Sequence, residues 1–436
     1  MRKLFLATLL LGSALMVNAQ SGTNSPYSQY GLGILSDQTS GFNRGMNGVG
    51  LGFHEHNQVN YLNPASYASL DSMTFILDAG ISGQVTNFEE NDVTKKTGVK
   101  KKKNANNSNF EYVVAGFRLL PHVGMSFGII PFTNVGYNYY QSKPKDMPSD
   151  MDFDYTNTYS GDGGLHQAYI GAGWEPVKGL AVGANFSYLW GSIDRSVSNS
   201  YSNSYYKTLT RYYSMQVNSY KVDFGVQYTH QFSKKDWATV GVTFSPGHGL
   251  GASADMKIIS NDTQNGVTDT TAYSIDKAYK LPTMIGAGVM WNHNNQWKVG
   301  FDYSLQKWGS LGYPSFDGTN YALKNGIYKD RSKFNLGAQY CYGERSRAFF
   351  KRVQYRVGAS YATPYYKMNG VDGPKEISVS AGFGIPIMNS YNNRSMLNIS
   401  GQWVKSSAKD LIKENSFRIN IGFTFNEDWF KKWKMD

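Results

Sequence analysis

The stretch GLAVGANFSYLWG, residues 179–191, alternates between apolar side chains and small or polar ones. One parity holds Leu180, Val182, Ala184, Phe186, Tyr188 and Trp190, and the other holds Ala181, Gly183, Asn185 and Ser187. Successive side chains of a β-strand point to opposite faces, so this stretch predicts a strand with one apolar face and one small, polar face. Whether these apolar side chains face lipid or the core of a β-sandwich decides the fold.

The same alternation returns along the chain to its last strand. It is plain in KVDFGVQYTHQF (221–232), QWKVGFDYSL (296–305), EISVSAGFGIPI (376–387) and FRINIGFTF (417–425). Fourteen strands are predicted, over 72–83, 109–120, 122–140, 152–175, 179–195, 212–231, 236–257, 271–292, 296–309, 331–343, 351–364, 374–387, 394–406 and 414–425. The longest of them, such as 236–257, are expected to project beyond the outer leaflet of the membrane.

The connections between these strands alternate in length. EPVKG, SKKD and HNNQ are short, whereas 84–108, 141–151, 196–211, 258–270 and 310–330 are long and polar. Short turns at one end, long loops at the other and an even number of strands are typical of an outer-membrane β-barrel. A soluble β-sandwich is the alternative, and the glycine-rich inward parity argues against it. The predicted fold is all-β: a 14-stranded antiparallel transmembrane β-barrel.

The N-terminus predicts export. Arg2 and Lys3 precede a short apolar core, and small residues precede a cleavage point at Gln20, which is the pattern of a cleaved signal peptide over 1–19. No run of eighteen apolar residues follows. Cys341 is the only cysteine, so no internal disulfide is expected despite export. The expected location is the outer membrane of a Gram-negative bacterium.

Residues 20–71 precede the first strand and are rich in Gly, Asn and Ser. A flexible leader is one interpretation, but the segment also carries the apolar bulk that a disordered leader lacks, in Tyr27, Tyr30, Leu32, Ile34, Leu51, Phe53, Tyr61 and Tyr67. Fourteen strands enclose a wide lumen, so we predict that this segment is a hatch or plug inside it. The predicted domains are the signal peptide 1–19, the hatch 20–71, the barrel 72–425 and a periplasmic tail 426–436.

Just before the first strand, the hatch carries Asn63, Pro64 and Ala65. With this motif and fourteen strands, the chain resembles the FadL/TodX family of outer-membrane transporters for hydrophobic compounds, whose N-terminal hatch carries Asn-Pro-Ala. The resemblance implies passive uptake of long-chain fatty acids or similar hydrophobic compounds, with lateral release through a gap at the third strand. Here that strand contains Pro131, which removes a ladder donor, so Pro131 is the candidate kink of a lateral gate. A simple bulge is the alternative.

Charged residues of the inward parity form the predicted polar wall of the lumen: Asp78, Arg118, Asp223, Lys298, Asp302, Arg356 and Arg418. They either hold the hatch by ion pairs or, for an Arg or Lys, meet a substrate carboxylate. His54 and His56 could share a strand face, but no further ligand is evident nearby, so a hydrogen-bonded pair is favoured over a metal site. No catalytic residue, cofactor or metal is predicted, and the chain is not expected to be an enzyme.

Two basic segments remain. The run Lys95–Lys103 is expected in a surface loop that is solvated or attracts lipopolysaccharide phosphates, because it lacks the aromatic residues that nucleic-acid binding would need. In the tail, Trp429, Phe430 and Trp433 alternate with lysines, which is typical of an interfacial segment or a docking site. The expected partners are membrane lipid, lipopolysaccharide, a hydrophobic small molecule and outer-membrane proteins, but no nucleic acid.

Three functions therefore compete. The first is the hydrophobic-compound channel. The second is a non-transporting FadL-like barrel that acts as a subunit or adaptor of a larger outer-membrane secretion or assembly machine, with its long loops and tail as docking surfaces. The third is a surface adhesin. A channel needs a continuous apolar path past the hatch, whereas a scaffold can have a filled lumen.

Overall fold

The computed structural model describes residues 23–91, 100–142, 155–203, 205–344, 346–368, 370–387, 395–409 and 411–428. The predicted signal peptide lies outside this part of the chain, and so do Trp429, Phe430 and Trp433 of the tail. Within the described residues, no helix has the length and apolar character needed to cross a membrane.

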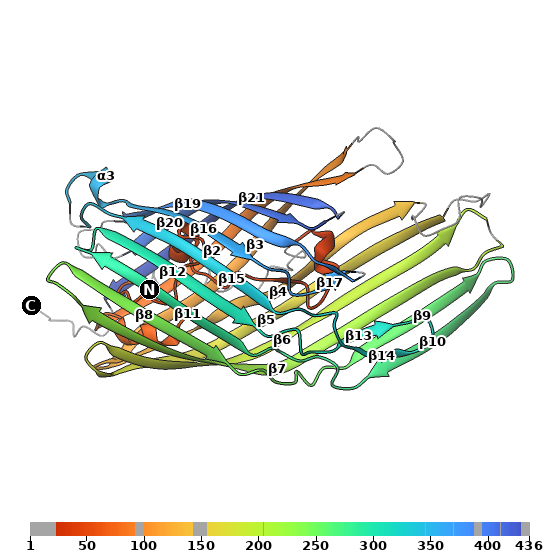
Figure 1. Ribbon diagram of the computed structural model, residues 1–436, viewed down its shortest axis with the longest axis horizontal. Helices are drawn as coiled ribbons and strands as arrows, with labels where there is room; N and C mark the ends of the chain where they lie inside the picture. The colour runs from red at the N-terminus through yellow and green to blue at the C-terminus, as the bar shows by residue number, and fades with distance from the viewer. Residues whose placement is uncertain are drawn as a thin grey trace, which may run out of the picture.

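Fourteen antiparallel strands close into a barrel, as predicted (Figure 1). Around the ring they are β2 (Thr74–Asn91), β3 (Lys100–Leu120), β4 (Val123–Ser142), β5 (Tyr155–Val177), β6 (Leu180–Tyr201), β7 (Thr208–Gln231), β8 (Asp236–Ser245), β11 (Met284–His293), β12 (Trp297–Gln306), β15 (Arg331–Tyr340), β16 (Gln354–Ala362), β19 (Lys375–Ile387), β20 (Ser395–Ser407) and β21 (Lys413–Asp428). The first and last of these strands pair from Thr74↔Asp428 to Glu89↔Lys413, which closes the ring. A closed sheet has no edge that hydrocarbon would leave without hydrogen bonds.

The other elements lie at the two ends of the barrel or inside it. Inside are the short N-terminal elements η1 (Pro26–Gln29), β1 (Ile34–Leu35), α2 (Gly41–Gly45) and η2 (Pro64–Ser69). At the long-loop end are the hairpins β9 (Ala254–Asp262) with β10 (Val267–Ile275), β13 (Tyr313–Phe316) with β14 (Tyr321–Lys324), and β17 (Lys367–Met368) with β18 (Val371–Asp372). The helical turn α3 (Phe349–Arg352) lies at the opposite end, between β15 and β16 (Figure 1).

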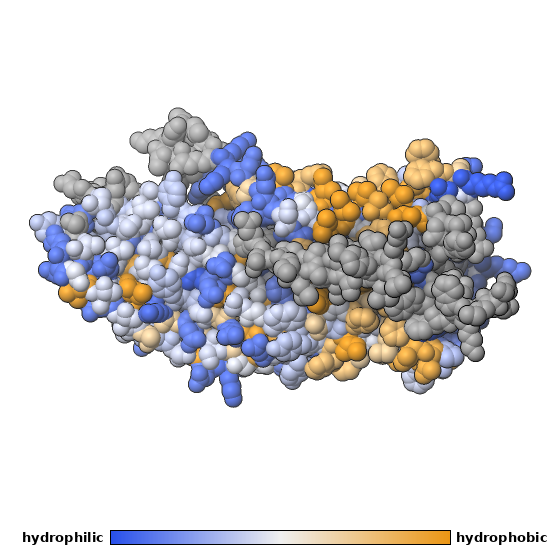
Figure 2. Space-filling view, turned by 180° about the vertical axis from the view of Figure 1, so that it is seen from behind, coloured by the Kyte–Doolittle hydropathy of each residue, from blue (hydrophilic) through white to orange (hydrophobic). Residues whose placement is uncertain are grey.

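The parity of the strands sets which side chains face outward. On β6, Phe186 and Tyr188 are exposed on the outer wall, while Asn185 and Ser187 are buried in the interior. Above Trp190 the outward residues of β6 turn polar, beginning with Ser192. Figure 2 shows the same change: hydrophobic residues gather over the half that carries the short turns, and the other half is mostly polar. The barrel therefore has one apolar belt, and its long strands continue well above it.

Two of the predicted strands are interrupted in the structure. The expected strand 236–257 ends at Ser245 and resumes as β9, and the expected strand 271–292 is divided between β10 and β11. Pro246 and Pro282 stand in the two interruptions, where their missing N–H groups end the ladder. The hairpin of β9 and β10 is instead added to the upper part of β7, from Thr208↔Asn261 to Ser214↔Asp255.

The long loops predicted over 84–108 and 196–211 are mostly strand. β2 reaches Asn91 and β3 begins at Lys100, so part of the lysine run continues the ladder rather than forming a loop. Polar pairs support this part of the hairpin outside the apolar belt, including the side chains of Asn87 and Asn104, 2.7 Å apart. Polar strands were missed because alternation of apolar residues is absent where both faces meet water.

The interior of the barrel contains two layers. Near the short turns, the segment 41–70 lies against the inner wall. Toward the long loops, an apolar cluster fills the space between β4, β5, β6 and β7 and the loops that fold inward. Its fully buried members include Leu165, Leu189, Val217, Ala254 and Trp308.

Candidate functional site

The Asn-Pro-Ala motif begins the helical turn η2 inside the barrel. Asn63 is its N-cap: the side-chain oxygen accepts a hydrogen bond from the N–H of Ala65 at 3.1 Å, and Pro64 occupies the first helical position. The amide nitrogen of Asn63 donates to the carbonyl of Leu51 at 2.9 Å and to the carbonyl of Val226 on β7 at 3.3 Å. One side chain thus starts the turn, joins it to the neighbouring loop and attaches it to the wall.

Inward-facing glycines make room for this contact. Gly124, Gly173, Gly183 and Gly225 lie side by side on β4, β5, β6 and β7, paired in register. A Cβ atom on Gly173 would lie 2.6 Å from the carbonyl oxygen of Pro64, closer than real contacts allow. The row of glycines continues around the barrel with Gly241, Gly288, Gly300, Gly337, Gly358, Gly382 and Gly422, each against the segment 41–70 or a neighbouring wall residue. The sequence shows these residues only as glycines of the inward parity.

Buried ion pairs fix the N-terminal segment to three strands. Arg44 of α2 contacts Glu111 of β3 at 2.7 Å and donates to Asn420 of β21 at 2.9 Å. Asp37 lies 2.8 Å from Lys333 of β15 and 3.4 Å from Arg418. Burial alone would raise the pKa of Asp37, but the charges of Lys333 and Arg418 outweigh burial and hold that pKa well below its usual range.

The predicted polar wall lies inside the barrel, and most of it contacts the N-terminal segment. Asp302 accepts the N–H groups of Gly50 at 2.7 Å and Leu51 at 3.0 Å. Lys298 forms an ion pair with Glu55.

The remaining wall residues have varied contacts. Arg118 donates to the carbonyl of Ala68 at 3.4 Å. Asp78 accepts a bond from Tyr112, whose hydroxyl in turn accepts the N–H of Gly41 at 2.5 Å. Arg356 bonds to other wall residues, Gln339 and Asn398, and its side chain lies where a Cβ on Gly45 would be. Asp223 bonds only to the wall, to Lys221 and Ser245.

Five charged residues of this network were not singled out from the sequence: Asp37, Arg44, Glu55, Glu111 and Lys333. Their one signal is position. Glu111 and Lys333 stand on the inward side of β3 and β15, and Asp37, Arg44 and Glu55 are, with Asp71, the Asp, Glu, Lys and Arg residues of the segment 20–71. The pairing itself spans 67 residues for Arg44 with Glu111, so no local pattern reveals it.

The wall has a seam between its second and third strands. The ladder of β3 with β4 ends at Val113↔Ile129, although both strands continue upward with their other neighbours. The register of β4 against β5 shifts between Pro131 and Thr133, at the residue that the sequence singled out.

The N-terminal segment occupies the edge that β4 leaves free at this seam. β1 pairs with β4 at Ile34↔Asn134 and Leu35↔Thr133, and Ser36 donates its N–H to the carbonyl of Phe132 at 3.0 Å. Further along β4, the N–H of Gly136 donates to the hydroxyl oxygen of Ser28 at 3.1 Å. The seam is therefore covered from inside by residues 28–36.

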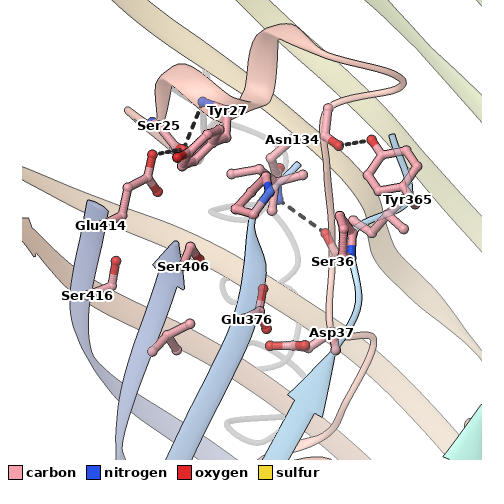
Figure 3. Close-up of a pocket in the computed structure, with 18 of the residues that line it drawn as sticks. Ser25, Tyr27, Ser36, Asp37, Asn134, Tyr365, Glu376, Ser406, Glu414 and Ser416 are labelled. Atoms are coloured by element: carbon pink, nitrogen blue, oxygen red, sulfur yellow. Dashed lines mark hydrogen bonds between the residues drawn. The ribbon is translucent and has the colours of Figure 1, made fainter. Parts of the chain in front are cut away.

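Two lumen cavities are lined mainly by polar groups. The larger, of about 140 Å³, lies beside β1 and is lined by residues such as Ser25, Asp37, Glu376, Glu414 and Arg418 (Figure 3). In it, Ser25 donates to Glu414 at 2.5 Å. The smaller, of about 70 Å³, lies between Tyr61 of the N-terminal segment and Asn185 of β6. Neither has the apolar lining that a long hydrocarbon chain needs.

The two histidines singled out in the sequence have separate partners. His54 bonds to Gln227 of β7 at 2.8 Å, and His56 pairs with Asp71 at 2.9 Å near the short turns. The hydrogen bond to Asp71 raises the pKa of His56, against the opposing effect of burial. No group of three or more His, Cys, Asp or Glu residues suited to a metal ion occurs in the part of the chain that the structure describes.

Solved structures with the same fold include toluene transporters and a FadL homologue. The toluene transporter TbuX of Ralstonia pickettii has a TM-score of 0.59 at 13% identity, with 88% of this chain and 97% of that chain covered. The toluene transporter TodX of Pseudomonas putida gives 0.59 at 13% identity, over 92% and 100% of the two chains. A FadL homologue of Pseudomonas aeruginosa gives 0.59 at 10% identity, over 90% and 98%. At these identities the likeness concerns the fold alone.

No match was found among curated proteins. The sequence model of the BamG family, in contrast, matches residues 1–436, the whole length of the chain. The resemblance to the FadL/TodX family is thus one of fold, and the family by sequence has another name. The chain belongs to the BamG family.

Proposed function

We propose that this protein is a closed outer-membrane barrel that acts as a subunit of a larger membrane-embedded machine and does not conduct solutes itself. The observation that carries the proposal is the filled lumen: the N-terminal segment is held in place by buried charges, and the upper interior is packed with apolar side chains. The sequence favours a hydrophobic-compound channel with the subunit role as the alternative, and we place the subunit role first because of the packing of the interior.

The size and chemistry of the cavities support a closed barrel over a channel for hydrophobic compounds. Pockets for drug-sized ligands enclose roughly 300–1,000 Å³ and are mostly apolar. The larger cavity here has about 140 Å³, and carboxylates and two arginines line it. A long hydrocarbon chain there would displace water from these charged and polar groups, and desolvation of such groups opposes its binding.

Movement of the N-terminal segment would also be costly. Separation of Arg44 from Glu111 leaves both charges buried, and breaking such a pair costs about 3–5 kcal/mol. The contacts of Asp302 with Gly50 and Leu51 and those of Asp37 with two cations add to this. A segment held by several such contacts is suited to a permanent plug.

The part of the barrel above the apolar belt offers a surface for partners. β5, β6 and β7 extend there with the added β9–β10 hairpin, and their outward residues include Ser196, Ser198 and Ser214. The outward face of this sheet bears neutral polar groups beside the exposed ring of Tyr212, and neutral groups cost less to desolvate against a protein than charged groups do. We assign the docking of the machine's other subunits to this sheet.

The test is affinity purification of the tagged full-length protein from native membranes in mild detergent. A partner protein that co-purifies in a fixed ratio, and is lost when Ser196, Ser198 and Ser214 are all changed to Arg, is the expected result. Purification of the protein as a lone monomer, with intact barrel, after cross-linking in whole cells would contradict the proposal. The control is the Lys375→Glu variant, at an exposed residue of β19 on the opposite side of the ring from β6.

A second candidate is passive transport of long-chain fatty acids or similar hydrophobic compounds, with lateral release at the seam. The fold of known transporters and the interrupted pairing of β3 and β4 favour it. A disulfide between Ile34→Cys and Asn134→Cys, in a Cys341→Ala background, would pin β1 to β4. Fatty-acid uptake by cells that falls on oxidation and returns on reduction supports transport, whereas equal uptake in both states, at the level of cells without the protein, supports the subunit role.

A further inference from the structure

The connection between β15 and β16, residues 341–353, is unlike the other short turns. It is longer, contains the helical turn α3 and has the sequence CYGERSRAFFKRV. It projects from the short-turn end of the barrel beside the ends of β16 and β19 (Figure 1). Short turns face the periplasm in outer-membrane barrels, so this connection lies at the periplasmic face.

The turn exposes aromatic rings next to cations. Phe350 is 76% exposed, Tyr342 is 52% exposed and Phe349 is 44% exposed. The ammonium of Lys351 lies 4.7 Å from the centre of the Tyr342 ring, and the guanidinium of Arg352 lies 5.4 Å from that of Phe349. In bulk water, three such rings in one turn would be an unfavourable exposure of apolar surface.

The position of the turn along the barrel axis indicates that its aromatic rings lie at the membrane–water interface. The hydroxyl of Tyr355 on β16 donates to the carbonyl oxygen of Phe350 at 3.1 Å. Tyr355 in turn contacts Phe383 of β19, with ring centres 5.8 Å apart, and Phe383 faces outward. Aromatic girdles of this kind mark the membrane–water interface of a barrel. Phe350 is therefore attached to the girdle and continues the apolar belt downward.

We propose that Tyr342 and residues 346–352 form an anchor that binds the periplasmic leaflet, with Phe349 and Phe350 inserted at the acyl boundary and Arg347 and Lys351 against lipid phosphates. The bound ligand is an anionic glycerophospholipid. Charge complementarity supports this choice, because three described cations, Arg347, Lys351 and Arg352, stand with one carboxylate, Glu344, which bonds to Gln354. A segment with aromatic residues on one side and cations on the other is typical of interfacial binding.

The first test measures how deeply position 350 is immersed. In a Cys341→Ala background, a spin label at Phe350→Cys is compared in lipid nanodiscs with labels at Phe301→Cys, on the lipid-facing wall, and Asn265→Cys, at an extracellular hairpin tip. We expect collisions with oxygen to exceed collisions with a water-soluble nickel complex at position 350, as at position 301. A ratio equal to that at position 265 overturns the proposal, and so does shielding that occurs only in native membranes, which would indicate a protein partner.

The second test concerns the phosphates. Native mass spectrometry of the full-length protein with phosphatidylglycerol should show fewer bound lipids for the double variant Arg347→Gln/Lys351→Gln than for the wild type. The matched control is Lys277→Gln/Lys280→Gln, which removes the same charge from exposed positions at the opposite end. Equal loss in the two variants, or none in either, would overturn the assignment of the phosphates to this turn.

Discussion

Arg44 carries a positive charge into the interior of the barrel, where only 5% of the residue is exposed. Such a charge is tolerated because Glu111 lies opposite it and the carbonyl of Thr39 and the amide of Asn420 accept its other N–H groups. The guanidinium of Arg44 therefore has all of its hydrogen-bond partners only when α2 is packed against the wall of the barrel.

The variant Arg44→Met should release α2. Loss of the cation leaves Glu111 buried without its partner, and we expect the local free energy of opening of residues 41–52 to fall by about 3–5 kcal/mol. Hydrogen exchange of the backbone amides of this segment measures the change. The control Lys207→Gln removes a surface pair with Asp262, 3.8 Å long, and should change exchange by less than about 1 kcal/mol. Equal protection in both variants would show that the ion pair does not hold the segment.

The glycine row makes a second prediction at this scale. In Gly225→Ala, the new methyl group would overlap the side chain of Asn63, so the Asn-Pro-Ala turn must move from β7. Overpacking of this kind costs about 1–3 kcal/mol. The control is Gly83→Ala, at a strand glycine with no atom within 4 Å of the added carbon. Limited proteolysis should cut the N-terminal segment faster in the first variant and at the wild-type rate in the second.

His56 predicts a pH dependence near the periplasmic mouth. Its hydrogen bond to Asp71 raises the pKa of the folded state above the usual value, so the protonated ring stabilises the contact. This contribution is fully present below the unfolded pKa of about 6.5 and is lost as the pH rises through the folded value. Proteolytic protection of residues 53–72 should therefore weaken from pH 6 to pH 8 in the wild type and be independent of pH in His56→Gln. Identical pH profiles would refute the role of this pair.

At the scale of elements, the alternation of apolar side chains predicted the strands wherever one face meets lipid. It failed above the belt, where β2 and β3 have mostly polar residues on both faces. The alternation also continues from β8 into β9, so it predicts one strand there. The structure interrupts the ladder at Pro246, which has no backbone N–H to donate. Periodicity reports the contrast between two environments, so it detects the membrane-spanning part of a strand and not its extension in water.

The added hairpin is separable from the barrel. β9 and β10 pair with each other and with the upper end of β7, while β8 pairs directly with β11. The carbonyl of Ala252 and the N–H of Ala278 are 2.9 Å apart, so residues 254–275 can be replaced by a two-residue turn. We expect the shortened protein to insert and to keep the heat-modifiable mobility of a folded barrel on gels. Failure to insert would show that the hairpin is needed for closure.

On the scale of the whole molecule, the sequence predicts inward charges and contains the Asn-Pro-Ala motif. It does not show which wall residue contacts which residue of the N-terminal segment. Six of the seven predicted wall residues contact the N-terminal segment directly or through one neighbour, and Asp223 alone does not. Which wall residue meets which hatch residue depends on barrel register, for example Asp37 with Arg418 across 381 positions. Register is set by the strands together, and no single stretch encodes it.

Removal of the N-terminal segment should turn the molecule into a pore. Barrels of 16–18 strands leave an aqueous channel, and a fourteen-stranded barrel with glycines and polar side chains on its inner wall approaches that width. A variant that lacks residues 23–70 exposes Asp302, Lys298 and Glu111 to water, which their charges favour. In planar bilayers we expect stable ionic conductance from this variant and little from the full-length protein. The double variant Asp37→Asn/Arg44→Met, which lacks both groups of ion pairs, should open intermittently. The apolar cluster beside the long loops is the remaining obstacle, because most of its side chains come from the wall and from loops, although the deletion removes its member Leu32. If the deletion variant inserts but stays closed, that cluster and not the N-terminal segment is the seal of the barrel.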